Sequence, residues 1–159
     1  MTAAEILNAL NTVERDHQLV LHKIQTFKDA VTCLLDPAGT DPRPVLQRLR
    51  QGVNFFTTEF SDHCFEEEAN LFPILEQQPG GDTLVAELRK QHVVLKDKCQ
   101  ELSTCLDVAG ELEDHVPRAV LRDVVTYGWQ LWELLDQHAH TETSAVHKCI
   151  AQTMANSMP

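Results

Sequence analysis

The sequence predicts an all-α fold, an antiparallel up-down-up-down four-helix bundle in one domain that spans residues 1–159. Helix-breaking residues gather in only three clusters, at 36–42, 79–82 and 110–117. Between these clusters no stretch shows the alternation typical of strands. Each of the four resulting segments carries an apolar stripe with alternating three- and four-residue steps. Four amphipathic helices joined by short connections favour an antiparallel bundle.

The first and second helices are expected on either side of the cluster at 36–42. The stripe of the first consists of Ile6, Leu10, Val13, His17, Val20, Ile24, Phe27, Val31 and Leu34. The stripe of the second consists of Val45, Leu49, Gly52, Phe56, Phe60, His63, Glu67, Leu71 and Ile74. Pro73 stands near the end of the second helix, where it should either kink the helix or begin its final turn.

The third and fourth helices follow the clusters at 79–82 and 110–117. The stripe of the third consists of Val85, Leu88, His92, Leu95, Cys99, Leu102 and Leu106. The stripe of the fourth consists of Leu121, Val124, Gly128, Leu131, Leu135, His138, Glu142, Ala145 and Cys149. Asp82 is expected to cap the start of the third helix, because a short polar side chain there can accept a hydrogen bond from a free N–H.

Composition narrows the class of protein. The net charge of −11 argues against nucleic-acid binding, because attraction to phosphates dominates such binding. No uninterrupted apolar run approaches the roughly 18 residues that a membrane helix needs, so no membrane partner is expected. The five cysteines are an odd number without a C-x-x-C pair, and the start of the chain lacks the pattern of a secretion signal. We therefore expect a cytoplasmic protein with reduced thiols.

Each apolar stripe contains one histidine. These are His17, His63, His92 and His138, and the second and fourth are followed four residues later by Glu67 and Glu142. On an α-helix this spacing places an imidazole and a carboxylate on one face. A lone core histidine is more often satisfied by hydrogen bonds than by a metal, but buried ionised carboxylates are costly unless they are paired. The six residues together therefore predict a two-metal site inside the bundle.

Position along the bundle supports this prediction. A helix rises by about 1.5 Å per residue. Glu67 stands roughly ten residues before the turn at 79–82 and His92 roughly ten after it, so the two are expected at one height. His17 and His63 are expected at similar heights across the first connection, and His92 and His138 across the third. We therefore expect all six side chains within a turn or two of a common layer.

The ligand types favour particular metals. Histidines outnumber carboxylates, and this combination suits iron or manganese, whereas zinc more often takes a closed tetrahedron with fewer carboxylates. We expect two iron ions, with manganese or zinc less favoured. Lys96 either extends to solvent or hydrogen-bonds a bound oxygen species. Glu59 either lies on a solvated face or accepts a hydrogen bond from a ligand N–H, and the flanking Glu66 and Glu68 are expected to be solvated.

The candidate ligands also follow an ordered pattern. It reads His17, then His63-x-x-x-Glu67 followed by Glu68 and Leu71-Phe72-Pro73, then His92, then His138-x-x-x-Glu142. Over essentially the whole chain this pattern resembles the hemerythrin-like (HHE cation-binding) family. The resemblance implies a four-helix bundle around a non-haem di-iron site, with Glu67 and Glu142 bridging the irons and the histidines as terminal ligands.

Two departures separate the chain from the oxygen-carrying hemerythrins. Those proteins have a fifth histidine where this chain has Lys96, and an aspartate five residues after their last histidine, whereas Glu142 follows His138 by four. The ligand set looks closer to the bacterial hemerythrin-like and iron-centre-repair branches. With one imidazole fewer, open positions are expected on both metals.

The resemblance implies a range of functions, since the family includes O2 carriers, O2 or redox sensors, NO-responsive proteins and proteins implicated in the repair of iron centres. We expect this chain to bind O2 or a related small molecule, NO or peroxide, for oxygen sensing, scavenging or delivery. One alternative is a di-iron redox enzyme that turns over peroxide or NO, or oxidises a small substrate. Another is an iron-handling or iron-centre-repair protein.

Overall fold

Helices are the only regular secondary structure among the residues described by the computed structural model, which are 3–35, 41–112 and 116–156. In chain order the elements are α1 (Ala3–Cys33), α2 (Arg43–Thr57), α3 (Glu59–Glu66), the π-helix η1 (Glu67–Leu71), α4 (Phe72–Leu75), α5 (Gly81–Glu111) and α6 (Arg118–Asn156). The predicted all-α class is confirmed. Residues 36–40 and 113–115 of two expected breaker clusters lie outside the described residues.

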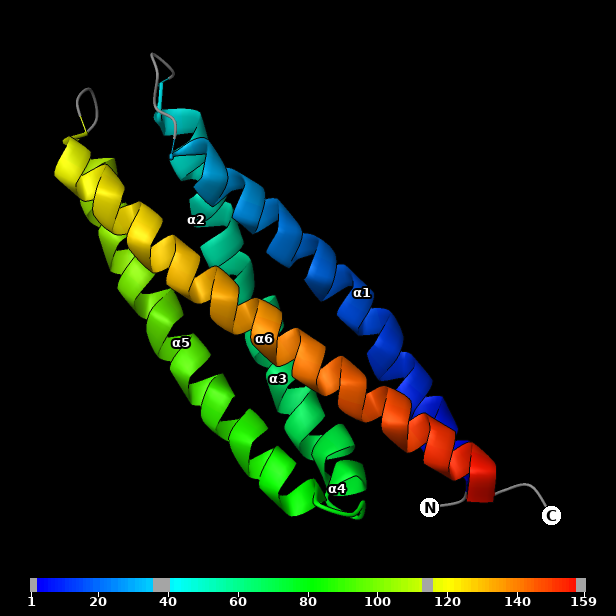
Figure 1. The fold of residues 1–159 in the computed structure, drawn as a ribbon. Coiled ribbons are helices and arrows are strands. Elements are labelled where there is room, and N and C mark those ends of the chain that lie inside the picture. Colours follow the sequence, from blue (N-terminus) through cyan, green and yellow to red (C-terminus); the bar gives the residue numbers. More distant parts are fainter. Residues whose placement is uncertain (1–2, 36–40, 113–115, 157–159) are drawn as a thin grey trace.

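The helices lie along one long axis (Figure 1). The chain runs along α1, returns through α2, α3, η1 and α4, runs back along α5 and returns again along α6. Helix α6 packs against both α1 and α5, and α2 packs against the same two helices. The apolar stripes of these segments therefore face a common interior.

The second of the expected helices is interrupted first at Thr58, which separates α2 from α3 with φ −115° and ψ −86°. The Thr58 hydroxyl donates to the carbonyl of Asn54 at 2.7 Å, and the Thr57 hydroxyl donates to the carbonyl of Val53 at 3.0 Å. Threonine hydroxyls that bond back to helix carbonyls bend helices. The break thus falls at two adjacent threonines that both bond back to the preceding turn.

The second interruption is the π-helical turn η1, which begins at Glu67 and ends at Leu71. Pro73 stands in the first turn of the short helix α4 that follows. Proline has no N–H to donate to the carbonyl four residues earlier, at residue 69, and its ring crowds that carbonyl. The regular α-helical ladder cannot continue through this point. Of the two roles expected of Pro73, the structure has the start of a final turn.

Helix α5 begins after a tight glycine turn rather than at the expected cap. Gly80 has a φ of 78°, in the left-handed region that favours glycine, and Gly81 is the first residue of the helix. Asp82 is therefore in the first turn and is not the N-cap, which corrects the expectation. A carboxylate at this position still interacts favourably with the positive end of the helix dipole.

Buried apolar side chains form two clusters along the axis. The larger includes Val20 of α1 and Leu95 of α5, and the smaller includes Leu10 of α1 and Leu88 of α5. On both helices the buried histidine lies between the two clusters. The buried polar residues are His17, Glu67, His92, His138 and Glu142. The core is thus divided by one polar layer.

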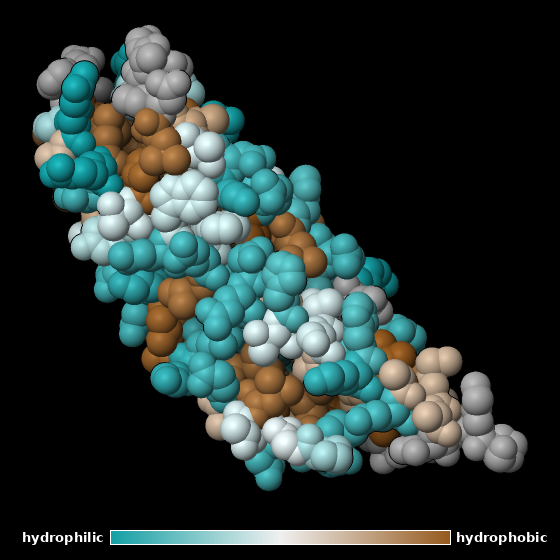
Figure 2. All heavy atoms as spheres, viewed as in Figure 1, coloured by the Kyte–Doolittle hydropathy of each residue, from teal (hydrophilic) through white to brown (hydrophobic). Residues whose placement is uncertain are grey.

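The face of the molecule drawn in Figure 2 is mostly hydrophilic. On the face shown in Figure 2, hydrophilic side chains cover most of the area, and the hydrophobic patches are separated from one another. Among the described helices, none combines the length and the apolar character that a membrane-spanning segment requires.

Candidate metal centre

All four passes of the chain contribute to the polar layer. The contributors are His17 on α1, His63 on α3, Glu67 at the start of η1, His92 on α5, and His138 and Glu142 on α6. The structure thus brings the six predicted residues together. By contrast, His22, His140 and His147 are exposed.

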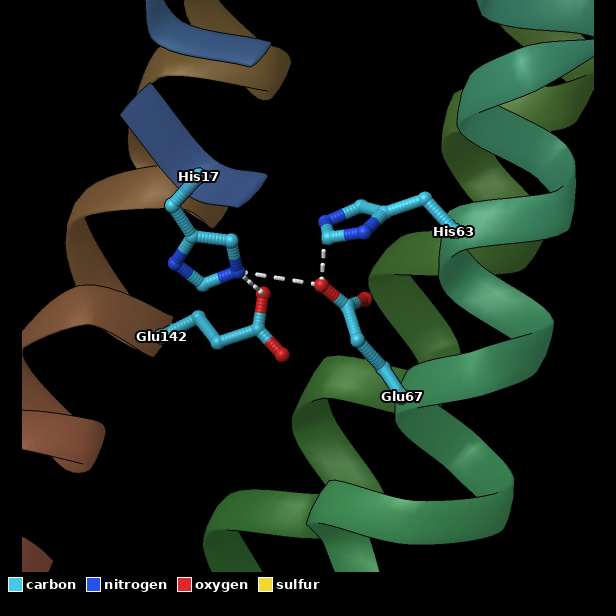
Figure 3. A group of neighbouring side chains, drawn as sticks. All are labelled: His17, His63, Glu67 and Glu142. Atoms are coloured by element: carbon cyan, nitrogen blue, oxygen red, sulfur yellow. Dashed lines mark hydrogen bonds and ion pairs between the residues drawn. The ribbon is translucent and has the colours of Figure 1, made fainter. Parts of the chain in front are cut away.

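The Glu67 carboxylate contacts three of the histidines. Its Oε1 atom lies 2.5 Å from Nε2 of His63 and 3.0 Å from Nε2 of His17. Its Oε2 atom lies 3.5 Å from Nε2 of His92. Figure 3 shows the rings of His17 and His63 next to this carboxylate, which they approach from different helices. Since only 2% of Glu67 is exposed, the imidazoles take the place of water around its charge.

The Glu142 carboxylate completes the layer from α6. Its Oε2 atom lies 3.2 Å from Nε2 of His17 and 3.5 Å from Nε2 of His138. The Nε2 atoms of His138 and His92 lie 3.3 Å apart. All four imidazoles therefore direct Nε2 toward the interior of the layer.

Three of the imidazoles form a hydrogen bond through Nδ1, the ring nitrogen that faces away from the interior of the layer. The hydrogen-bonded pairs are His92 with Glu68 at 2.8 Å, His138 with Gln91 at 3.1 Å and His17 with Thr143 at 3.4 Å. Metal-binding histidines typically bond in this way, because the outer partner fixes both the ring orientation and the tautomer. With the proton on Nδ1, the lone pair of Nε2 points into the layer.

The three outer partners were not identified from the sequence. Glu68 was expected to be solvated, and its side chain is partly exposed, yet it is hydrogen-bonded to His92. Glu68, Gln91 and Thr143 each adjoin a candidate ligand in the sequence, which is the only signal that marks them. Adjacent residues on a helix point about 100° apart. Their contacts are made to ligands on other helices, so only the assembled bundle reveals them.

Aromatic rings cover the layer on its two apolar sides. Phe60, from the larger apolar cluster, lies 5.8 Å from His63 and 6.2 Å from His138, measured between ring centroids. Phe72, from the smaller cluster, stacks on His92 at 5.5 Å. These rings restrict the imidazoles and exclude water from both sides.

The buried charges shift several pKa values. Burial disfavours the charged form of His17, but hydrogen bonds and charges from Glu142 and Glu67 outweigh it and raise the pKa to about 9. Burial and the neighbouring charge of His92 lower the pKa of His138 to about 3. Burial raises the pKa of the Glu142 carboxyl, whereas hydrogen bonds from histidines overcome burial and hold the pKa of Glu67 below its ordinary value. A positive charge between the two carboxylates is thus strongly favoured.

Two carboxylate oxygens in the layer have no hydrogen-bond partner. They are Oε2 of Glu67 and Oε1 of Glu142, and they are the only fully buried side-chain polar atoms without one in the described part of the chain. Leaving such an atom unpaired costs roughly 1–3 kcal/mol or more. One ligand atom from each of His17, His63, Glu67 and Glu142 lies within 4.8 Å of the others. Nitrogen and oxygen donors in this arrangement fit a divalent cation, which would satisfy both oxygens.

Comparison with protein-family models decides the family. The model of the hemerythrin HHE cation-binding domain matches residues 8–150. The chain belongs to the hemerythrin HHE family. No curated protein and no solved structure matches it. A cation-binding domain therefore occupies most of the chain, and the suspected resemblance is confirmed.

Two pockets connect the layer of this hemerythrin-family domain with the outside. One of about 570 Å³ lies between α1 and the α3–α4 stretch, and its lining includes His63 and Glu67. Another of about 240 Å³ lies between α5 and the stretch from α2 to η1, and its lining includes His92 and Glu68. A small molecule can thus approach the layer from two directions.

The two expected neighbours of the layer differ in position. Lys96 is exposed and lines the smaller pocket together with His92. Glu59 is the exposed first residue of α3, and no hydrogen bond or ion pair found among the described residues joins it to a candidate ligand. The location of Lys96 is compatible with either of its expected roles. The location of Glu59 agrees with the first of its two expected roles, a residue on a solvated helix face.

Proposed function

We propose that two iron ions bind in the polar layer and that these irons bind O2, NO or peroxide for sensing, scavenging or delivery. The proposed ligands are His17, His63, His92, His138, Glu67 and Glu142. The observation that carries the proposal is the pair of unpartnered carboxylate oxygens, buried in the middle of an apolar core and faced by four inward-directed imidazoles. Iron is proposed because imidazole and carboxylate together suit it.

Bound iron would supply open coordination positions and a reversible change of oxidation state. The chain itself supplies orientation and protection. Glu68 and Gln91 hold the rings of His92 and His138 so that Nε2 faces inward. Phe60 and the two apolar clusters keep bulk water out along the axis, and the two pockets leave lateral paths for a small molecule.

We also propose a cytoplasmic location. All five cysteines are free, and no disulfide is formed among them. Thiols that remain reduced are typical of a reducing compartment. The proposed small-molecule partners need no membrane or nucleic-acid surface.

Metal analysis of freshly purified protein, followed by absorption spectra of the reduced protein before and after exposure to air, tests the proposal. We expect about two irons per chain and new visible bands that disappear on degassing. Glu67→Gln should lose iron, because it removes the carboxylate shared by three histidines. Glu66→Gln is the matched control, since the neighbouring Glu66 is exposed and its carboxylate accepts a hydrogen bond from Asn70 rather than from a proposed ligand.

The possible outcomes separate the alternatives. Absence of iron from the wild-type protein would overturn the iron site. Two irons that oxidise directly and remain oxidised would contradict reversible binding and favour a redox enzyme. Ready transfer of iron to an apo acceptor protein would favour iron handling.

A further inference from the structure

Cys64 has a position in the layer that the six proposed ligands do not account for. It follows His63 on α3, is partly buried and lines the smaller pocket together with His92. Its Sγ atom, one carboxylate oxygen of Glu67 and one ring nitrogen of His92 all lie within 4.8 Å of one another. Metals make bonds of about 2.0 Å to nitrogen and oxygen and about 2.3 Å to sulfur. Small side-chain rotations would therefore let one ion reach all three atoms.

The unpartnered oxygen of Glu67 points independently to a ligand at this place. Its Oε1 atom is already contacted by His17 and His63. Its Oε2 atom lies 3.5 Å from Nε2 of His92 and has no hydrogen-bond partner, although Glu67 is only 2% exposed. The two oxygens thus have different neighbours, and the one near His92 has no hydrogen-bond donor to satisfy it.

The side-chain atoms that could coordinate a metal near Oε2 of Glu67 can also be identified. Nδ1 of His92 is hydrogen-bonded to Glu68 at 2.8 Å, so Nε2 is the ring nitrogen available to a metal. Cys99 lines the same pocket, but it belongs to no group of metal-ligating side chains found among the described residues. Of the two cysteines in the pocket, only Cys64 is therefore placed to bind an ion together with Glu67 and His92.

We propose that the Cys64 thiolate is a further metal ligand, so that the ion held by His92 and Oε2 of Glu67 has a mixed sulfur, nitrogen and oxygen environment. This inference rests on the proposed metal function. The thiol releases its proton to water as the sulfur–metal bond forms, and no oxidant is required. The other ion, near His17 and Glu142, keeps only nitrogen and oxygen ligands. Because thiolate is the softer ligand, the two positions differ in metal preference, and the sulfur-containing one favours zinc more than its neighbour does.

Titration of the metal-free protein with Co²⁺, followed by absorption spectroscopy, tests the inference. Thiolate ligation gives an intense near-ultraviolet charge-transfer band in addition to the weak visible bands of bound Co²⁺. We expect the intense band in the wild type and its loss in Cys64→Ser, with the visible bands retained. Cys99→Ala is the matched control and should keep the intense band. Circular dichroism verifies that each variant is folded.

A second measurement does not depend on a variant. X-ray absorption at the zinc edge of the zinc-loaded wild type should contain a sulfur shell at about 2.3 Å. Bound metal with neither a thiolate band nor a sulfur shell would overturn this inference and leave the proposed function standing. A wild-type protein that takes up no iron, cobalt or zinc would overturn both.

Discussion

At the scale of single residues, His17 has the most consequential position in the layer. Its Nε2 atom lies 3.0 Å from Oε1 of Glu67 and 3.2 Å from Oε2 of Glu142. Without a metal, a proton on this ring is the only positive charge in contact with both carboxylates among the described residues. A metal ion and this proton therefore compete for the same place, because only the neutral imidazole can coordinate.

Metal binding should consequently release a proton and strengthen as the pH rises toward 9. The pKa of His17 is raised from 6.5 to about 9, so at pH 7.5 the ring of the metal-free protein is charged and must lose its proton. Above pH 9 it is already neutral and the competition ends. Titration calorimetry in buffers of different ionisation enthalpy measures the released protons. The same metal affinity at pH 7 and pH 9 would contradict this assignment.

The outer hydrogen bonds give a prediction that spares every proposed ligand. Gln91→Ala removes the partner of Nδ1 of His138 while leaving Nε2 in place. We expect metal affinity to fall by about 10- to 100-fold, measured by competition with a chelator of known affinity. Gln100→Ala, at an exposed position of the same helix, should leave affinity unchanged. Equal affinities for both variants would assign Gln91 to packing alone.

How well single residues could be predicted depends on where their contacts are made. A histidine and a glutamate four residues apart, as in His63 and Glu67, lie on one helix face whatever the tertiary structure. The six candidates were therefore found from spacing, and the structure places them in one layer. Gln91 and Glu68 act across the space between helices, where sequence spacing gives the height of a residue but not which side chains touch.

At the scale of elements, the turn before α5 sets the position of the helix that carries His92. Gly81 is buried at its start, and a Cβ atom there would lie 1.9 Å from the carbonyl oxygen of Leu75. Main-chain atoms cannot rotate away as a side chain can. The close approach of α5 to the end of α4 therefore requires glycine.

Gly81→Ala should lower the free energy of unfolding by about 1–3 kcal/mol, measured by urea denaturation of the metal-free protein. Gly110→Ala is the matched control on the same helix. Its Cβ would meet only the tip of Arg50, at 3.3 Å, and alanine is the better helix former. The control should therefore be neutral or more stable. Equal midpoints for the two variants would show that the turn relaxes freely.

The long helices could be predicted better than their interruptions. The apolar stripes of α1, α5 and α6 run through continuous helices, as expected. In the second segment, the break at Thr58 and the turn η1 are accompanied by local hydrogen bonds that a hydrophobic stripe does not encode. The Thr57-Thr58 pair and Pro73 were the available signals, and only the proline was recognised. The π-turn starts at Glu67, in keeping with the frequent occurrence of such turns at functional sites.

At the scale of the whole molecule, the polar layer lies between a larger and a smaller apolar cluster. A ligand that binds only the folded state stabilises it, by about 2.7 kcal/mol at a free concentration of one hundred times Kd. Chelation should therefore lower the thermal midpoint of the loaded wild type. Glu67→Gln, with its impaired site, should change little on chelation. Identical midpoints for the loaded and stripped wild type would contradict binding in the core.

The division of the core also concerns the cooperativity of unfolding. Leu10 and Leu88 belong to one apolar cluster and Val20 and Leu95 to the other. The layer between them contains two buried carboxylate oxygens without a hydrogen-bond partner, which a bound cation would link. With the ion, the two ends of the bundle should unfold as one unit. Without it, the end around Leu88 should exchange its amide hydrogens through local openings that leave the other end intact. The ion would then determine whether this chain contains one cooperative folding unit or two.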